Sequence, residues 1–257
     1  MIFNMTHFWL ASWTLCEREL VRFLRQRSRV IGAFLPPVVF WFLIGSGLAH
    51  SFRGANYLQY FFPGTIVLIL LFTAIFSTIS IIEDRHAGFL QSALVAPLSR
   101  VTIVTGKIGG AALLALIHSL PFLFLAPLAG LTVPVSQWIP LLLLLTALSI
   151  GQAGLGFLIA WRLDSSQGFH AIMNLFLIPM WLLSGALFPP SGAARWINVV
   201  MHLNPLTYGV LGLQECFYAN GVPLGHGPIS FDACLAISAG FAALTILASI
   251  LSARQTA

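Results

Sequence analysis

Charge is what this sequence lacks most. Only 7% of its 257 residues are Asp, Glu, Lys or Arg, while 58% are hydrophobic; soluble domains carry about 25% charged residues. So few charges could not cover a soluble protein of this length without large exposed apolar patches. The composition therefore predicts an integral membrane protein. Its long apolar runs do not alternate over segments of about ten residues, as a β-barrel requires, so the predicted class is all-α.

Motifs for catalysis and metal binding are also missing. The sequence contains no Walker A motif, no His-Glu-x-x-His and no Gly-x-Ser-x-Gly. The glycine order of "GQAGLG" (151–156) does not fit a nucleotide fingerprint, and ordinary helix packing is the preferred interpretation. His118, in mid-span, is expected to face a neighbouring helix because no second metal ligand is close in sequence. We expect no catalytic residue, metal site or cofactor in this chain.

The cysteines and carboxylates are few and poorly placed for chemistry. Three cysteines have neither metal nor redox spacing. A disulfide between Cys216 and Cys234 stays open, and buried free thiols are the preferred alternative. Ion-coupled carriers and proton pumps keep a carboxylate near mid-membrane, whereas the carboxylates here end spans or lie in loops. An ion-driven mechanism therefore has no obvious carrier residue.

Uncharged stretches define six predicted membrane spans. A spanning helix needs about 20 apolar residues, and the stretches between charged residues supply helices at roughly 31–51, 58–82, 108–130, 138–161, 168–187 and 232–252. With both termini in the cytoplasm, ten of the twelve Lys and Arg residues lie on the inner side, as the positive-inside rule requires. The basic charge is thus a topology signal, and no basic face for nucleic acid is expected.

An amphipathic helix is predicted at 6–29, ahead of the first span. Trp9 and Trp13 recur with Phe and Leu near helical spacing. Basic residues repeat at intervals of three and four, at Arg18, Arg22, Arg25 and Arg29. This pattern is typical of a helix lying on the inner leaflet, with its cations against anionic lipid headgroups. A soluble tail is the alternative, which the paired Trp residues disfavour.

The segment 188–229 lies on the outer side and is too apolar for a free loop. It begins near Pro189, and Asn204-Pro205 breaks it shortly before Tyr208, so that neither half is long enough to span the membrane. We expect a helical hairpin that re-enters the outer leaflet. Such backbone is tolerated where protein or water satisfies its polar groups.

The segment 83–107 is polar and broken by proline, between two apolar runs. Gly88 and Pro97 are placed to bracket one short helix that starts with Phe89 and Leu90. Charged residues flank this helix, namely Glu83, Asp84, Arg85, Arg100 and Lys107. On the predicted topology the helix projects from the inner face, which suits docking to a soluble partner. A polar loop held against headgroups is the alternative.

Two motifs carry a family resemblance. "EDRHAGFLQSALVAPLSRVTIVTGK" resembles a signature of the ABC-2 type permeases, the membrane subunits of type V ABC exporters: an acidic-basic cluster, Gly, a Leu-rich segment, "P-x-S-R" and "GK". "LSGALFPPSGAARWINVVMHLNPLTYGVLGLQE" is similar to the second signature, "SG-x-x-FP" followed by "NP" and "TY". "RELVRFLRQRSR" before the first span also fits, and His86 is a departure from the usual pattern.

The resemblance implies an assembly and a function. It implies one ABC-2 type transmembrane domain over 1–257, paired with a second permease copy, as a homodimer, and with two separately encoded ATPase subunits that bind ATP and Mg. The complex would lie in a bacterial plasma (inner) membrane and move a drug, lipid or lipid-linked glycan outward. The segment 83–107 would couple to the ATPase, the helix 6–29 would brace it, and the hairpin would cap the exit. A membrane-embedded lipid-modifying enzyme and an ion-coupled carrier are the alternatives.

Overall fold

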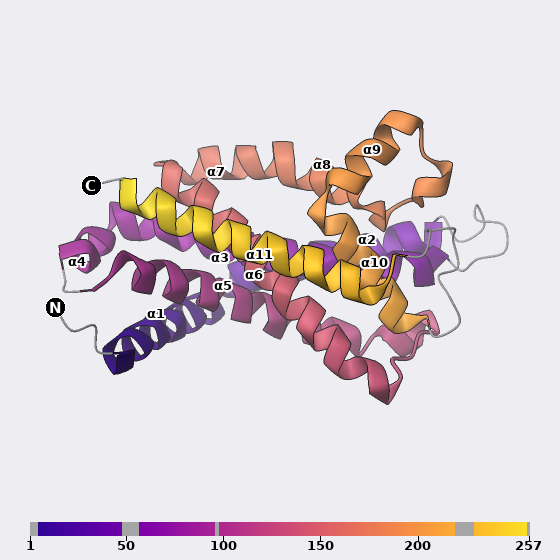
Figure 1. Cartoon of the computed structure of the whole chain (residues 1–257), viewed down its shortest axis with the longest axis horizontal. Helices are drawn as coiled ribbons and strands as arrows, with labels where there is room; N and C mark the ends of the chain where they lie inside the picture. The colour runs from indigo at the N-terminus through magenta and orange to yellow at the C-terminus, as the bar shows by residue number, and fades with distance from the viewer. Residues whose placement is uncertain (1–4, 48–56, 96–97, 219–228, 256–257) are drawn as a thin grey trace.

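The computed structural model is a bundle of long helices that run along one common direction (Figure 1). It describes residues 5–47, 57–95, 98–218 and 229–255, and this part of the chain contains helices and no β-strand. Six helical stretches within it are long and apolar enough to cross a membrane. The all-α class and the six predicted spans are therefore confirmed.

The six candidate spans are formed by the longest helices. They are α2 (Arg27–Gly47), α3 (Tyr57–His86), α5 (Arg100–Leu123), α6 (Trp138–Arg162) with the turn before it, the interrupted helix from α7 to η4, and α11 (Phe231–Gln255). The interrupted helix consists of α7 (Ser166–Ile172), η3 (Met173–Leu177), α8 (Ile178–Trp181) and η4 (Leu182–Ala186).

Shorter helices lie at the ends of these spans. They are α1 (Met5–Arg25), α4 (Phe89–Val95), η1 (Ala126–Ala129), η2 (Val135–Gln137), η5 (Pro190–Gly192), α9 (Arg195–Leu203) and α10 (Pro205–Phe217). The predicted helix at 6–29 is therefore too long at its C-terminal end, because Gln26 separates α1 from α2 and Arg29 belongs to the first turn of the span.

Two predicted span ends are also wrong. The helix of span two continues through Glu83 to His86, and the helix of span three begins at Arg100 instead of 108. Ser99 starts α5, since its side chain accepts a hydrogen bond from the backbone N–H of Thr102 at 3.1 Å. Charged residues were taken as helix ends, but here they belong to the helices because carboxylates and cations pair with one another.

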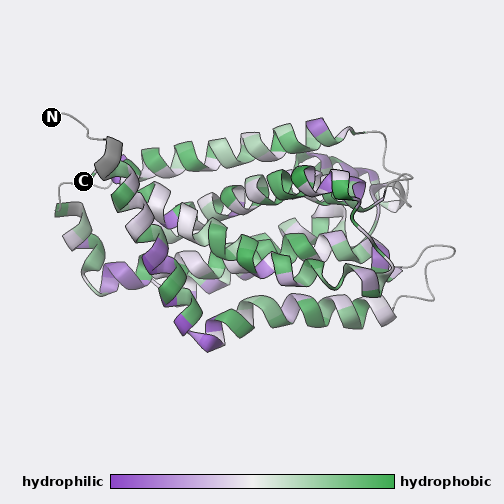
Figure 2. Cartoon of the chain, turned by 90° about the horizontal axis from the view of Figure 1, so that it is seen from below, coloured by the Kyte–Doolittle hydropathy of each residue, from purple (hydrophilic) through white to green (hydrophobic). Residues whose placement is uncertain are grey.

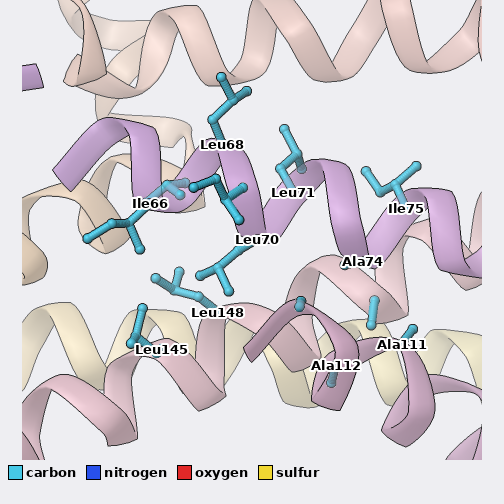
Figure 3. Close-up of a cluster of buried hydrophobic side chains, with 14 of the residues drawn as sticks. Ile66, Leu68, Leu70, Leu71, Ala74, Ile75, Ala111, Ala112, Leu145 and Leu148 are labelled. Carbon is cyan, nitrogen blue, oxygen red and sulfur yellow. The ribbon is translucent and has the colours of Figure 1, made fainter. Parts of the chain in front are cut away.

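The central helix of the bundle is α3. It packs against α2, α5 and α6, and its hydrophobic residues are buried on every side, as expected for a helix that is apolar all round. Figure 3 shows Leu70 directed toward Leu148 of α6, with Ala111 and Ala112 of α5 on the same side.

By contrast, α2 and α11 keep many large apolar side chains exposed. Figure 2 shows that hydrophobic residues dominate the long helices and that hydrophilic ones gather toward the bundle ends.

Two glycines of α5 let α1 approach closely. A Cβ atom at Gly106 would lie 2.7 Å from Leu15 Cβ, and one at Gly110 would lie 2.8 Å from Glu19 Cβ. Real Cβ atoms do not approach so closely, so these two positions require glycine. Small residues four apart often serve helix packing, and for Gly106 and Gly110 the packing partner is α1.

We expect Gly110→Leu to push α1 away from α5. Burial raises the pKa of the Cys16 thiol, with a further contribution from Glu19, so this thiol is shielded and unreactive in the folded protein. Labelling of Cys16 by a maleimide, read by peptide mass spectrometry, should become at least about tenfold faster once α1 separates from α5.

Gly109→Leu is the matched control for this experiment. It places the same side chain one residue earlier, where a Cβ atom would meet nothing within 4 Å. Equal labelling rates in the two variants would contradict the assignment of Gly110 to the α1 interface.

Candidate functional site

The ion pairs of the described residues gather at one end of the bundle. There α3 ends, α4 follows, and the last turn of α11 lies nearby (Figure 1). Four consecutive residues end α3, from Glu83 to His86. Because successive residues on a helix point about 100° apart, these four side chains reach different neighbouring helices.

Asp84 is at the centre of a buried ion-pair network. Arg18 of α1 donates two hydrogen bonds to its carboxylate, at 2.7 and 2.9 Å, and Arg22 donates a third at 2.6 Å. Lys107 of α5 pairs with the same carboxylate and also with Glu19, whose Oε1 is 2.6 Å from Lys107 Nζ. Asp84 is 1% exposed and Lys107 3% exposed. Buried charges are stable only when they are paired in this way. Hydrogen bonding to Asp84 also raises the pKa of Arg18.

Glu83 extends the network to α2. It accepts a hydrogen bond from Arg22 at 2.7 Å and a second from Arg29. Arg18, Arg22 and Arg29 were predicted to face lipid headgroups. The structure pairs each of them with a carboxylate of α3, which the prediction did not include, and their contact with headgroups stays a prediction. Partly buried carboxylates hold a guanidinium through several hydrogen bonds in fixed geometry. Arg25 is exposed.

The aromatic residues of α1 have a different orientation from its arginines. Trp9 and Trp13 are both exposed. Together with Arg25 they keep the prediction of an interfacial role, since exposed Trp residues are typical of membrane interfaces.

Arg85 binds the end of α6. It donates to the backbone carbonyls of Trp161 at 2.5 Å and Leu163 at 2.9 Å, and to the carboxylate of Asp164 at 2.7 Å. His86 Nε2 lies 2.6 Å from the backbone oxygen of Asp164. The last carbonyls of a helix have no partner inside the helix, so Arg85 both satisfies them and fixes α6 to α3.

The last four residues of α3, from Glu83 to His86, and the side chains that bind them form a polar anchor. A short helix follows this anchor, as predicted. Gly88 adopts φ of +73°, the left-handed conformation that turns the chain after a helix, and α4 spans Phe89–Val95. The Arg18 guanidinium lies 3.7 Å above the ring of Phe89, a cation–π contact that joins α1 to α4. Pro97 lies outside the described residues.

One face of α4 is packed and the other is free. Leu90 and Ala93 are buried, whereas Gln91 and Ser92 are exposed and Val95 is 88% exposed. Single exposed apolar side chains are common on protein surfaces, so Val95 marks the part of α4 that is available for contact with another protein.

After this helix the chain is fixed again by Arg100. It donates from Nη1 to the backbone carbonyls of Ala253, at 2.5 Å, and Arg254, at 3.0 Å, at the end of α11. The segment 83–107 is therefore attached to α1, α2, α6 and α11 through side chains. Of its predicted charged residues, Glu83, Asp84 and Lys107 belong to the ion-pair network. Arg85 binds α6 and Arg100 binds α11.

Sequence reasoning missed Glu19. This carboxylate lies on the buried face of α1 with Ser12, Leu15, Cys16 and Phe23, which recur at intervals of three and four. An acidic residue on the apolar face of a basic helix was the available signal, because a buried carboxylate requires a cation from another element.

Asn204-Pro205, from the second sequence motif, lies beside an irregular turn in the helix of the fifth span. Gly185, with φ of +81°, interrupts the helix, and backbone oxygens there need partners. Asn204 Nδ2 donates to the carbonyls of Met180 at 2.5 Å and Leu183 at 3.1 Å, and Tyr60 donates to the carbonyl of Gly185 at 2.5 Å. The Asn-Pro pair therefore serves backbone satisfaction, as membrane-embedded irregular segments require.

The segment around this motif is helical on both sides of the break. Asn204 caps α10, since its side chain accepts from Leu206 N at 3.0 Å, and Pro205 is the first residue of that helix. Pro189 precedes η5, and Tyr208 donates to the backbone oxygen of His202 at 2.9 Å. Two short helices are thus present where a hairpin was predicted. Their re-entry into the outer leaflet stays a prediction, and 219–228 lies outside the described residues.

The remaining candidate residues have packing roles. Cys16, Cys216 and Cys234 are free and buried, in agreement with the preferred interpretation. His118 faces Phe23 of α1, with 5.4 Å between ring centroids, as expected for a histidine between helices. In "GQAGLG", Gly151 and Gly154 face α11 and Gly156 faces α3, which confirms ordinary helix packing.

Fold and site together define an all-α, multi-pass membrane protein with six candidate spans and a polar anchor beside a short helix. The family model described as ABC-2 type transporter matches residues 11–218. This match covers α1 from residue 11 onward, the anchor, α4 and the Asn-Pro motif. The chain belongs to the ABC-2 type transporter family.

Similar proteins agree with this family. The putative transport permease ycf38 of Cyanophora paradoxa is 28% identical over 205 residues, covering 77% of this chain and 71% of the relative. Nodulation protein J of Sinorhizobium fredii is 26% identical over 217 residues, covering 79% and 78%. The daunorubicin resistance ABC transporter permease protein DrrB1 of Streptomyces coeruleorubidus is 22% identical over 254 residues, covering 94% and 82%. The chain is therefore a membrane transport permease subunit.

Proposed function

We propose that this chain is the permease of an ATP-driven exporter that moves a hydrophobic or amphipathic substrate outward, while a separate ATPase subunit binds ATP and Mg. Family membership supports the transport role. The ATP-driven mechanism is supported by the way α4 is attached. This short helix has one free face, and the segments before and after it are bound to several spans.

The proposed mechanism follows from these attachments. Gln91, Ser92 and Val95 form the free face that meets the ATPase. When the ATPase moves α4, the displacement reaches α1 through Phe89 and Arg18. It reaches α6 through Arg85 and α11 through Arg100. ATP binding then favours one of two packings of the spans, because the ATPase contacts α4 differently in each.

The assembly in this proposal contains two copies of the permease and two ATPase subunits. We place it in a bacterial plasma membrane with both termini in the cytoplasm, since ten of the twelve Lys and Arg residues then lie inside. A hollow of about 560 Å³ between α6, α8 and α9 has almost only apolar lining residues. This volume is typical of ligand pockets and suits a drug, a lipid or the lipid part of a glycan carrier.

No observation favours the two alternatives. An ion-coupled carrier needs a carboxylate that can take up and release its ion, whereas Asp84 accepts from two arginines and one lysine. A lipid-modifying enzyme needs converging reactive groups at one depth. Within the described residues, no three His, Cys, Asp or Glu side chains come close enough to hold a metal ion.

The docking role of α4 can be tested with Val95→Glu. A carboxylate at the centre of a protein contact loses its hydration without gaining a partner, so the ATPase retained by the purified permease should fall by at least about tenfold. Both subunits would be quantified after affinity purification through the permease.

Val135→Glu is the matched control, since Val135 is also 88% exposed but lies in η2, at the other end of the bundle. Undiminished ATPase in the Val95→Glu sample would contradict docking on α4.

A further inference from the structure

A second hollow lies beside the anchor, between α2, α3 and α7. Its volume is about 340 Å³, at the small end of the range for ligand pockets. The coupling mechanism does not use it. One side is polar, with Gln26, Ser28, Arg29 and Ser166, and the other is apolar, with Phe76 and Ile79.

The polar side offers hydrogen-bond donors without protein acceptors. Among the described residues, the side chains of Gln26, Ser28 and Ser166 have no hydrogen-bond partner, and the Arg29 guanidinium donates to Glu83 from Nη2 alone. Donors that converge on a hollow of this kind are available to a ligand.

The charge of the surroundings is positive. Glu83 also lines the hollow, but its two oxygens accept from Arg22 and Arg29. The whole network holds four cations and three carboxylates: Arg18, Arg22, Arg29 and Lys107 against Glu19, Glu83 and Asp84. One positive charge is therefore left uncompensated by protein.

From this combination we infer that the hollow binds an anionic amphiphile, with its phosphate-like head on Arg29, Gln26 and Ser28 and its apolar part along Phe76 and Ile79. Arginine binds phosphate oxygens through charged hydrogen bonds, and the apolar side removes the start of an acyl chain from water. The volume holds a headgroup and the first part of a chain, while the rest lies among the lipids. The position at the inner end rests on the proposed topology; the binding itself needs no ATPase.

Gly32 provides a precise way to block the hollow. It lines the cavity, and a Cβ atom there would meet nothing within 4 Å. Leucine at this position adds a side chain to the wall of the hollow from a Cβ position that is free, and it favours the helix more than glycine does. Gly47→Leu is the control on the same helix, because a Cβ atom at Gly47 also meets nothing within 4 Å and Gly47 does not line the hollow.

The experiment is native mass spectrometry of the full-length protein in detergent, titrated with dioleoyl phosphatidylglycerol or dioleoyl phosphatidylcholine. We expect tighter binding of the anionic lipid, a loss of about tenfold in Gly32→Leu, and no change in Gly47→Leu. The double variant Gln26→Leu with Ser28→Ala should weaken the binding of both lipids, because it removes two donors to the phosphate while the positive charge of the network remains. Equal binding of the two lipids by the unaltered protein, or unchanged binding in both Gly32→Leu and the double variant, would overturn the inference.

Resident lipid and cargo can then be distinguished in proteoliposomes that contain the ATPase. If the anionic amphiphile is cargo, Gly32→Leu slows the ATP-dependent movement of headgroup-labelled phosphatidylglycerol. If it is a resident lipid, that movement stays unchanged while the bound lipid is still lost. Either outcome supports the site. Failure of the Val95→Glu test would affect the proposed transport mechanism and leave this binding result intact.

Discussion

Lys107→Met is expected to destabilise the folded protein by about 3–5 kcal/mol, the cost of removing one partner from a buried ion pair. Methionine keeps the approximate length of the side chain and removes its charge. The carboxylates of Glu19 and Asp84, which are 3% and 1% exposed, then lose the ammonium group that they share. The two arginines that remain on Asp84 do not replace it, because Lys107 joins α5 to both α1 and α3.

Thermal unfolding in detergent would measure this effect. The midpoint should fall by roughly 10 °C, the shift expected when a chain of this size loses several kcal/mol. Arg162→Met is the control. Arg162 is an exposed cation at the end of α6 with no ion pair among the described residues, and its loss should change the stability by less than about 0.5 kcal/mol.

The triple variant Lys107→Met, Glu19→Gln and Asp84→Asn should recover part of the lost stability, since it leaves no unpaired buried carboxylate. The explanation would be wrong if Lys107→Met melted at the same temperature as the unaltered protein.

Most of the fold was predictable because it depends on composition. Six stretches of about 20 apolar residues form helices in a membrane whatever their exact order, since lipid offers no partner for an open backbone. The short helix after Gly88 was predictable for a local reason, namely that glycine reverses the chain and proline ends a helix. Gly106 and Gly110 indicated a close helix contact because they are four residues apart.

The partners in the anchor were not predictable. The arginines of α1 have the spacing of an interfacial helix, and this spacing is the same whether they face headgroups or carboxylates. The difference depends on how α1 rotates about its axis, which Gly106 and Gly110 fix by admitting the face that carries Leu15 and Glu19. That is tertiary information, and no local pattern contains it.

The limits of the spans were misplaced for a related reason. Counting uncharged residues treats each charge as the end of a span, but Lys107 lies two turns inside α5. A charge can enter a helix bundle when its partners are already there. Arg85 and Arg100 illustrate a further limit, because they bind backbone carbonyls at the ends of α6 and α11, and a carbonyl has no signature in the sequence.

Arg85→Gln is expected to lower ATP-driven transport by at least about tenfold while the protein still inserts with its normal topology. Arg85 holds α6 against α3 through the carbonyls of Trp161 and Leu163, and the loss of a charged hydrogen bond costs about 1.5–3 kcal/mol. In the proposed mechanism this contact transmits the movement of α4 to α6, so the ATPase would still bind and hydrolyse ATP without moving cargo. On the proposed topology, nine cations would remain on the inner side, enough to keep the orientation.

Transport and ATP hydrolysis by the reconstituted complex would be measured together, because only their ratio separates uncoupling from loss of the partner. Asp164→Asn is the matched control: it removes the exposed half of the same contact. Asp164 is 86% exposed, and an ion pair in water contributes about 0–1 kcal/mol, so transport should fall by less than about threefold. If Arg85→Gln reduced hydrolysis and transport equally, Arg85 would serve ATPase docking. If the variant failed to insert, the residue would serve topology. In either case the transmission of movement from α4 to α6 through Arg85 would have to be abandoned.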